Sequence, residues 1–335
     1  MHLAQKQQRL AALIFYLLPL VYMALYGLYG FADTDQGFVP ALAWRITSGQ
    51  VPYVDFCYVR PPLTPYLHGL EMLAWPRPLE IMGSRLDCYI MLWATVYWGM
   101  QTLRRFFKTD EWGAGFWWMG TLAFIFSVHN FPPMPWHTVD GVFFGSLGIW
   151  LLTHPRARWQ MALGLGALAL AALAKQPFAI LIPVGIGGLF CLQPPKVAMQ
   201  VVLATSIALA ALTAATLHWA LPPGFLAAMW IQITGASSLP ELFKTGLLAY
   251  LLPAAMLAAA TIAAYLTAKA KPQIKAYLPT LGKLALFALA LYPLGWLGLT
   301  LWKQSFQPPR LGFYHALLLI AAAYSAICWR KGHVK

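Results

Sequence analysis

Residues 10–32 read LAALIFYLLPLVYMALYGLYGFA, an apolar run without a single charged side chain. A helix needs about 20 such residues to cross a bilayer, so this run is long enough to span one. Lys6 and Arg9 precede the run, which exceeds the usual apolar core of a signal peptide. We therefore expect an uncleaved first transmembrane helix, with cleavage of a signal peptide at Gly30-Phe31-Ala32 as the alternative.

The rest of the chain has the same character. Of its 335 residues, 60% are hydrophobic and 10% are charged, whereas soluble domains carry about 25% charged residues. The net charge of +13 falls in short gaps between apolar runs, without a basic stripe or a nucleic-acid-binding motif, which argues against nucleic acid as a partner. The four cysteines are far apart and predict neither a disulfide framework nor a zinc site.

Apolar runs recur to the end of the chain, at about 10–32, 85–103, 112–128, 139–153, 159–174, 178–192, 197–219, 246–268, 284–302 and 311–329. They predict an all-α polytopic membrane protein of about ten transmembrane helices. We expect a single transmembrane domain over residues 1–335, without a separate soluble domain. The stretch 159–192 is either two short spans or one broken span, because Lys175-Gln176-Pro177 interrupts it.

Charge placement predicts the orientation. With the N-terminus in the cytoplasm, fifteen of the 23 basic residues fall in cytoplasmic gaps, as the positive-inside rule expects. The C-terminus is then cytoplasmic too. Eight of the ten acidic residues fall on the outer side, which suggests that the polar chemistry of the protein takes place there. These residues are Asp33, Asp35, Asp55, Glu71, Glu80, Asp87, Asp140 and Glu241.

The first outer loop, residues 33–84, contains two short helical patterns. One covers 36–48 and follows Thr34 and Asp35, which are possible helix caps. The other covers 63–75, with its leucines on one face and His68 and Glu71 on the other. This spacing is typical of a helix that lies in the membrane interface.

Two aspartates, Asp33 and Asp35, stand at the outer end of the first run. At this spacing they are candidate oxygen ligands for a divalent cation, and one of them is a candidate general base toward a hydroxyl group. The alternative for Asp35 is a simple cap of the next helix. Further along the loop, Asp55 precedes Arg60, which stands directly before Pro61-Pro62. Arg60 either extends to the interface or binds a phosphate bidentately.

Two later segments add polar residues at expected span ends. The segment PWHTVDG, residues 135–141, enters the fourth run with His137 and Asp140. An ionisable group at that depth suggests function, although Thr138 or Asp140 as a helix cap is the alternative. Lys175 is either a side chain that extends to the interface or a second partner for a phosphate.

The order of these motifs resembles the first loop of GT-C class membrane glycosyltransferases. The motifs are D-x-D-Q-G-F, A-W-R-I, G-x-V-P-Y-x-D-F and R-P-P-L-T-P-Y-L within residues 30–75, supported by W-H-T-V-D-G at 136–141 and L-A-K-Q-P at 173–177. They look closest to the bacterial aminoarabinose-transferase, protein mannosyltransferase and rhizobial core-sugar transferase group. The expected fold is then a GT-C-like bundle with two interfacial helices in its first outer loop.

The resemblance implies an inverting glycosyltransferase with a polyprenyl-phosphate-linked sugar, such as an undecaprenyl-phosphate sugar, as its donor. The acceptor would be a hydroxyl of a glycan, a lipid or a protein in the cell envelope, and the active site would be periplasmic. Asp35 matches the loop aspartate proposed as catalytic base, Arg60 replaces the lysine that contacts the donor phosphate, and Asp140 matches an acidic residue of the second outer loop. Gln36 replaces the usual Glu, which weakens the expectation of a metal ion.

From the residues themselves, Lys175 is a second candidate for the donor phosphate, and Asp33, Asp55 and His137 are expected near the site. Two other functions use the same substrates. A flippase or transporter of lipid-linked sugars predicts ionisable residues spread through the membrane midplane, whereas here they cluster at one mouth. A polymer ligase or polymerase would use the same donor class.

Overall fold

The computed structural model describes residues 2–30, 35–107, 109–130, 134–155 and 157–236. This part of the chain is all-helical, with ten α-helices and no β-strand. The helices are α1 (His2–Tyr22), α2 (Phe38–Thr47), α3 (Leu63–Ala74), α4 (Glu80–Phe106), α5 (Ala114–Asn130), α6 (His137–Thr153), α7 (Arg158–Ala174), α8 (Leu181–Leu192), α9 (Pro195–Trp219) and α10 (Phe225–Ala236). The predicted all-α class is confirmed for these residues.

Seven helices correspond to the first seven predicted apolar runs: α1, α4, α5, α6, α7, α8 and α9. The two helices expected in the first outer loop are also present, as α2 and α3. By contrast, α10 lies in a gap for which no helix was expected. The runs 246–268, 284–302 and 311–329, and with them the full count of ten spans, lie outside the described residues.

The stretch 159–192 forms two helices. Helix α7 ends at Ala174, and Lys175 has an extended backbone with φ −157° and ψ 134°. A short 3₁₀ turn, Gln176–Ile180, then leads into α8. Pro177 fits this break, because proline has no N–H for the helical ladder and is tolerated in the first turn of the new helical segment.

Two apolar cores hold the helices together. The first joins α1, α4 and α5 and includes the buried Phe15, Leu92 and Phe124. The second joins α6, α7, α8 and α9 around Leu168 and Leu189. Helices α6 and α7 approach closely at Gly148 and Gly164: a Cβ atom on Gly148 would lie 2.8 Å from the Gly164 carbonyl oxygen. Small residues therefore set the spacing of this helix pair.

Large apolar side chains also cover much of the outer surface. On α9, Ile207 is 70% exposed and Leu212 is 64% exposed. Two helical segments in the described residues are long and apolar enough to cross a membrane, Ala4–Gly27 and Pro195–Trp219, judged by length and composition alone.

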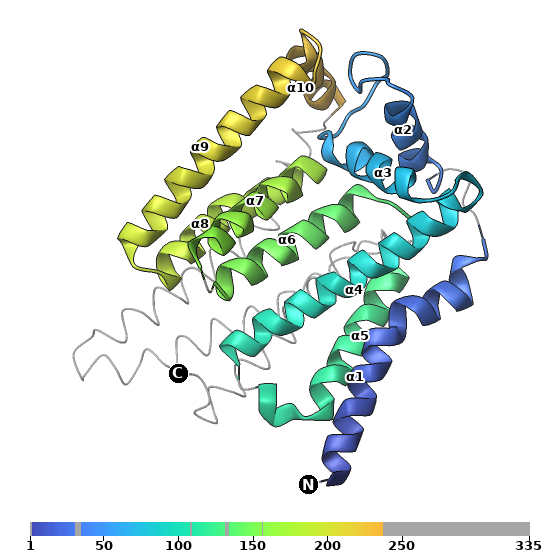
Figure 1. Cartoon of the computed structure of the whole chain (residues 1–335), viewed down its shortest axis with the longest axis vertical. Coiled ribbons are helices and arrows are strands. Elements are labelled where there is room, and N and C mark those ends of the chain that lie inside the picture. The colour runs from blue at the N-terminus through green and yellow to red at the C-terminus, as the bar shows by residue number, and fades with distance from the viewer. Residues whose placement is uncertain (1, 31–34, 108, 131–133, 156, 237–335) are drawn as a thin grey trace, which may run out of the picture. The chain divides into compact units, whose positions relative to one another are not determined.

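Helices α2, α3 and α10 lie at one end of the longer helices (Figure 1). Helix α2 packs against α3, and α3 contacts α4 and α7. By compactness the chain divides into residues 1–237 and 238–335, and every described residue belongs to the first unit. The prediction of one domain over the whole chain therefore extends beyond the described residues.

Candidate functional site

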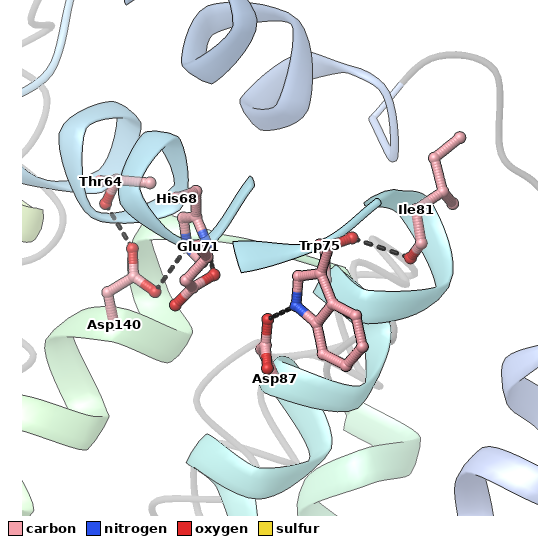
Figure 2. Close-up of polar contacts among 8 residues, drawn as sticks. Thr64, His68, Glu71, Trp75, Ile81, Asp87 and Asp140 are labelled. Carbon is pink, nitrogen blue, oxygen red and sulfur yellow. Dashed lines mark hydrogen bonds and ion pairs between the residues drawn. The ribbon is translucent and has the colours of Figure 1, made fainter. Parts of the chain in front are cut away.

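A buried carboxylate stands where α6 meets α3. Asp140, in the first turn of α6, is 0% exposed and accepts hydrogen bonds on both of its oxygens. Thr64 Oγ1 donates to Oδ2 over 2.5 Å, and His68 Nε2 contacts Oδ1 over 3.1 Å. On its other side, His68 Nδ1 lies 2.5 Å from Glu71 Oε2. Figure 2 shows this chain of contacts from Thr64 through Asp140 and His68 to Glu71.

The two carboxylates determine the charge of His68. Burial alone would lower the pKa of this imidazole, but Asp140 and Glu71 outweigh burial and raise the pKa to about 10. The geometry agrees, since both ring nitrogens face carboxylate oxygens and an imidazolium can donate from both. His68 is therefore a buried cation at neutral pH, held between two acidic side chains.

Helix α3 turns its polar side inward. Thr64 and His68 are buried, whereas Leu70 is 70% exposed and Leu73 is 73% exposed. The sequence pattern separates Leu70 and Leu73 from His68, but Leu67 of the same predicted face packs against the core of α1, α4 and α5. The pattern also does not reveal that the polar face packs against protein. A small cavity of about 40 Å³ adjoins this face, with His68, Glu71, Trp75 and other residues in its lining. The end of α3 is joined to α4 by Trp75 Nε1, which donates to Asp87 over 2.8 Å (Figure 2).

Arg60 lies in the loop between α2 and α3 and reaches toward the start of α6. Its guanidinium carbon lies 5.7 Å from the centre of the Trp136 ring, a cation–π contact. The Tyr53 hydroxyl donates to the Arg60 carbonyl oxygen and so closes the loop on itself. Two residues before Arg60, Tyr58 is buried and its hydroxyl is hydrogen-bonded to His137 Nε2 over 2.8 Å.

His137 is the first residue of α6 and is 0% exposed. Its Nε2 is used by Tyr58, while its Nδ1 is buried without a hydrogen-bond partner in the described part of the chain. Burial raises the pKa of Tyr58 above the ordinary value, so the phenol keeps its proton in this contact. A buried ring nitrogen without a partner is costly, which makes His137 Nδ1 a candidate contact for a bound ligand.

Lys175 approaches the same helix start from the other side. Its Nζ donates to Thr138 Oγ1 over 2.8 Å, one residue after His137. The next residue, Gln176, donates from Nε2 to the Val59 carbonyl oxygen over 3.4 Å. Arg60 and Lys175 therefore reach the residues directly before and after His137. Neither Thr138 nor Asp140 caps α6, whose N-cap position is Trp136 without a side-chain hydrogen bond.

The aspartates of the first loop have separate positions. Asp35 is exposed in the turn before α2, and Gly37 rather than Asp35 takes the N-cap position. Phe38, the first residue of α2, places its ring centroid 6.2 Å from that of His137. Asp55 is exposed, and its Oδ2 accepts from the Val51 N–H over 2.7 Å, which closes a local turn. Asp33 lies outside the described residues.

Arg85 of α4 is a residue that the sequence analysis missed. It is buried and donates to the Gly27 carbonyl over 2.6 Å, to the Tyr29 carbonyl and to the Gly30 carbonyl. It also donates to Gln36 Oε1 over 3.2 Å. Arg85 therefore fixes the end of the first helical segment and the start of the loop that carries Asp35. Its position in an apolar helix, where a charge is costly, is the only sequence signal.

Thr64 and Tyr58 were missed, and His68 and Glu71 were noted only as the polar face of the helix over 63–75. For Thr64 the signal was its place in a polar stripe with His68 and Glu71, at spacings of four and three residues. Within the described residues, no group of three or more His, Cys, Asp and Glu side chains is placed to hold a metal ion.

Comparison of the chain with family models, with curated proteins and with solved structures found no match.

Proposed function

We propose that the chain is an integral membrane glycosyltransferase that moves a sugar from a polyprenyl-phosphate-linked donor to an acceptor hydroxyl at the outer face of the inner membrane. One observation carries the proposal. Arg60, His137 and Lys175, which come from three separate parts of the chain, meet at the start of α6 beside the buried Asp140. Two cations and an unsatisfied imidazole nitrogen in one place suit a phosphate.

The distribution of polarity supports a bilayer as the surroundings. Asp140, His68 and His137 are buried, while leucine and isoleucine side chains of α3 and α9 are exposed. Water disfavours the exposed apolar side chains, whereas the buried charged groups are paired and are tolerated in either surrounding. In lipid the same arrangement is favourable.

The contacts join segments that the predicted alternation of spans places on one side of the membrane. The alternation of spans assigns residues 33–84, 129–138, 175–177 and 220–245 to the outer side. Tyr58 contacts His137, Lys175 contacts Thr138, and Gln232 contacts Tyr58, so all four segments are joined by hydrogen bonds. The candidate site is built entirely from segments assigned to the periplasmic side.

The proposed reaction is a single displacement. The acceptor hydroxyl oxygen attacks the anomeric carbon of the sugar and forms the new C–O bond, while the bond between that carbon and the phosphate oxygen breaks. The polyprenyl phosphate leaves with the electron pair, and Arg60 and Lys175 stabilise its developing charge. Asp35 takes the acceptor proton as general base. Its exposed position in the turn before α2 leaves it accessible to an acceptor.

The experiment is sugar transfer by the purified protein in liposomes that contain a polyprenyl-phosphate sugar and candidate acceptors. We expect transfer by the wild type and a loss of about 100-fold or more in Asp35→Asn, because a general base contributes on that scale. Asp55→Asn is the matched control, since Asp55 closes a local turn. Transfer at the wild-type rate by Asp35→Asn would remove the base assignment.

The same preparation separates the alternatives. Movement of the lipid-linked sugar across the bilayer without any transfer would identify a flippase and overturn the proposal. Transfer to a growing polymer end, rather than to a single acceptor hydroxyl, would identify a polymerase or ligase that uses the same donor.

A further inference from the structure

Helix α10 holds the loop between α2 and α3 through one side chain. Gln232 Oε1 accepts a hydrogen bond from the Tyr58 N–H over 2.9 Å. Its Nε2 donates to the Tyr53 carbonyl oxygen over 2.7 Å. A single amide side chain therefore binds two peptide groups of the loop, one as a donor and one as an acceptor, as the backbone of a neighbouring strand would do.

The loop has an irregular backbone that needs such a partner. Tyr53 has φ +70° and is the only non-glycine residue with a positive φ in the described ranges. The Tyr53 N–H is satisfied within the loop, since it donates to the Phe56 carbonyl over 2.8 Å. A conformation of this kind is strained and persists only where surrounding contacts hold it. Gln232 supplies hydrogen bonds to two peptide groups of this loop, the Tyr58 N–H and the Tyr53 carbonyl oxygen.

Apolar packing from the same helix face supports these bonds. The Phe225 ring lies 5.2 Å from the Tyr53 ring in an edge-to-face arrangement. Phe225, Tyr53, Phe56 and Tyr58 belong to one buried cluster. Phe225 and Gln232 are seven residues apart, which is two helical turns, so both lie on the side of α10 that meets the loop.

The two residues that Gln232 binds are the ones that connect the loop to the candidate site. The Tyr58 hydroxyl is hydrogen-bonded to His137, and the Tyr53 hydroxyl donates to the Arg60 carbonyl oxygen. A shift of Tyr53 or Tyr58 would therefore move Arg60 and leave His137 without its partner. The two tyrosines therefore link Gln232 to the backbone of Arg60 and to His137.

We infer that Gln232 is a positioning residue of the donor-phosphate site, acting through Tyr53 and Tyr58 on Arg60 and His137. The identification of the ligand as a donor phosphate rests on the proposed function, whereas the hold of Gln232 on the loop rests on the contacts above. Glutamine is required because its planar amide offers one acceptor and one donor at this reach. Glutamate at this position would present an acceptor to the Tyr53 carbonyl, which is also an acceptor.

The first arm of the test measures the loop directly. Cys57 directly precedes Tyr58 in the loop that Gln232 binds. Its side chain is exposed, so a nitroxide spin label can be attached to it. With Cys191 and Cys328 replaced by serine, and with Cys88 buried, the label reports on this loop alone. We expect greater label mobility in Gln232→Ala and Gln232→Glu. Gln200→Ala, which removes a glutamine that binds Arg158 elsewhere on the surface, is the matched control and should leave the spectrum unchanged.

The second arm measures sugar transfer from the polyprenyl-phosphate sugar in liposomes. In Gln232→Ala we expect the KM for the donor to rise and kcat to fall, so that kcat/KM drops about tenfold, because Arg60 both binds the donor phosphate and stabilises its developing charge. The melting temperature should stay close to that of Gln200→Ala. A merely structural role would lower the melting temperature and kcat without a rise in KM.

The outcomes separate the two proposals. Unchanged label mobility in both Gln232 variants would show that Gln232 does not hold the loop, and would overturn the inference. Greater mobility with an unchanged KM overturns the positioning role. A wild-type protein that binds the lipid but transfers no sugar overturns the proposed function, while the label still decides whether Gln232 holds the loop.

Discussion

The carboxylate of Asp140 has both oxygens occupied, one by Thr64 and one by His68, and no part of it reaches solvent. In this position it joins the start of α6 to the polar face of α3. Removing one partner of a buried charged pair is costly because the other charge stays buried without compensation. The residue therefore matters for the fold of the site whether or not it touches a substrate.

We predict that Asp140→Asn lowers the free energy of unfolding by about 3 kcal/mol, the typical cost of breaking a buried ion pair. The amide cannot accept from both Thr64 and His68 as the carboxylate does. Thermal unfolding in detergent measures the change. Asp55→Asn is the control and should shift the transition much less, because Asp55 is exposed. Equal shifts in the two variants would contradict the described network.

The charge of His68 predicts a pH dependence. Its pKa is raised from 6.5 to about 10 by Asp140 and Glu71, against the effect of burial, and Asp87 of α4 also acts on it. A raised pKa means that the imidazolium stabilises the folded state fully below about pH 6.5, and that this contribution is lost as the pH rises through about 10.

Accordingly, we expect the melting temperature of His68→Gln to lie furthest below that of the wild type near pH 6.5. The difference in melting temperature between the wild type and His68→Gln should narrow steadily toward pH 10. His218→Gln, which changes an exposed histidine of α9, should show no such trend. A gap for His68→Gln that stays constant or widens with pH would mean that the folded protein does not hold a cationic imidazole there.

At the scale of elements, α3 and α10 show what the sequence could and could not predict. The boundaries of α3 were predicted within one residue, because Pro61-Pro62 and the leucine spacing mark them. The direction in which its polar face points was not predicted, because amphipathicity separates two faces without showing which of them packs against protein. Helix α10 was missed since its twelve residues are short for a span and lie in a gap assigned to a loop.

The exposed face of α3 predicts contact with lipid. We expect a fluorophore attached to Leu70→Cys or Leu73→Cys, in a background with the native exposed cysteines replaced by serine, to be quenched by brominated lipids. A fluorophore at Gln50→Cys, in the exposed turn after α2, should be quenched far less. Equal quenching at all three positions would show that α3 does not lie in the interface.

From the sequence, His137, Asp140 and Lys175 were expected at the same site as Arg60, but the contacts that join them were not predicted. Arg60, His137, Asp140 and Lys175 were singled out by charge in apolar surroundings, and the structure brings them to the start of α6. Their partners Thr64 and Tyr58 were not singled out, because threonine and tyrosine are common in such a sequence and only packing shows which residues they contact.

For the whole molecule, the hydrogen bonds between segments follow the predicted alternation of sides. Segments assigned to the outer side bind one another around the candidate site. On the opposite side, Arg158 at the start of α7 donates to Gln200 near the start of α9 over 3.2 Å. Each of these contacts joins segments that the predicted alternation places on the same side of the membrane.

The two exposed cysteines test this topology. In a Cys328→Ser background, a membrane-impermeant maleimide added to intact cells should label Cys57, in the first outer loop. It should not label Cys191, near the end of α8 that the charge pattern assigns to the cytoplasm, until the membrane is permeabilised. Labelling of Cys191 but not Cys57 in intact cells would reverse the orientation and put the candidate site in the cytoplasm.

The central claim is that Arg60 and Lys175 bind the phosphate of a polyprenyl-linked sugar beside His137. Native mass spectrometry of the protein released from membranes or mild detergent tests it most directly, by the mass of the lipid that stays bound. We predict a polyprenyl-phosphate sugar on the wild type, and its loss in Arg60→Ala and in Lys175→Ala. Retention of the same bound lipids by all three proteins, or phospholipid alone on the wild type, would contradict the claim.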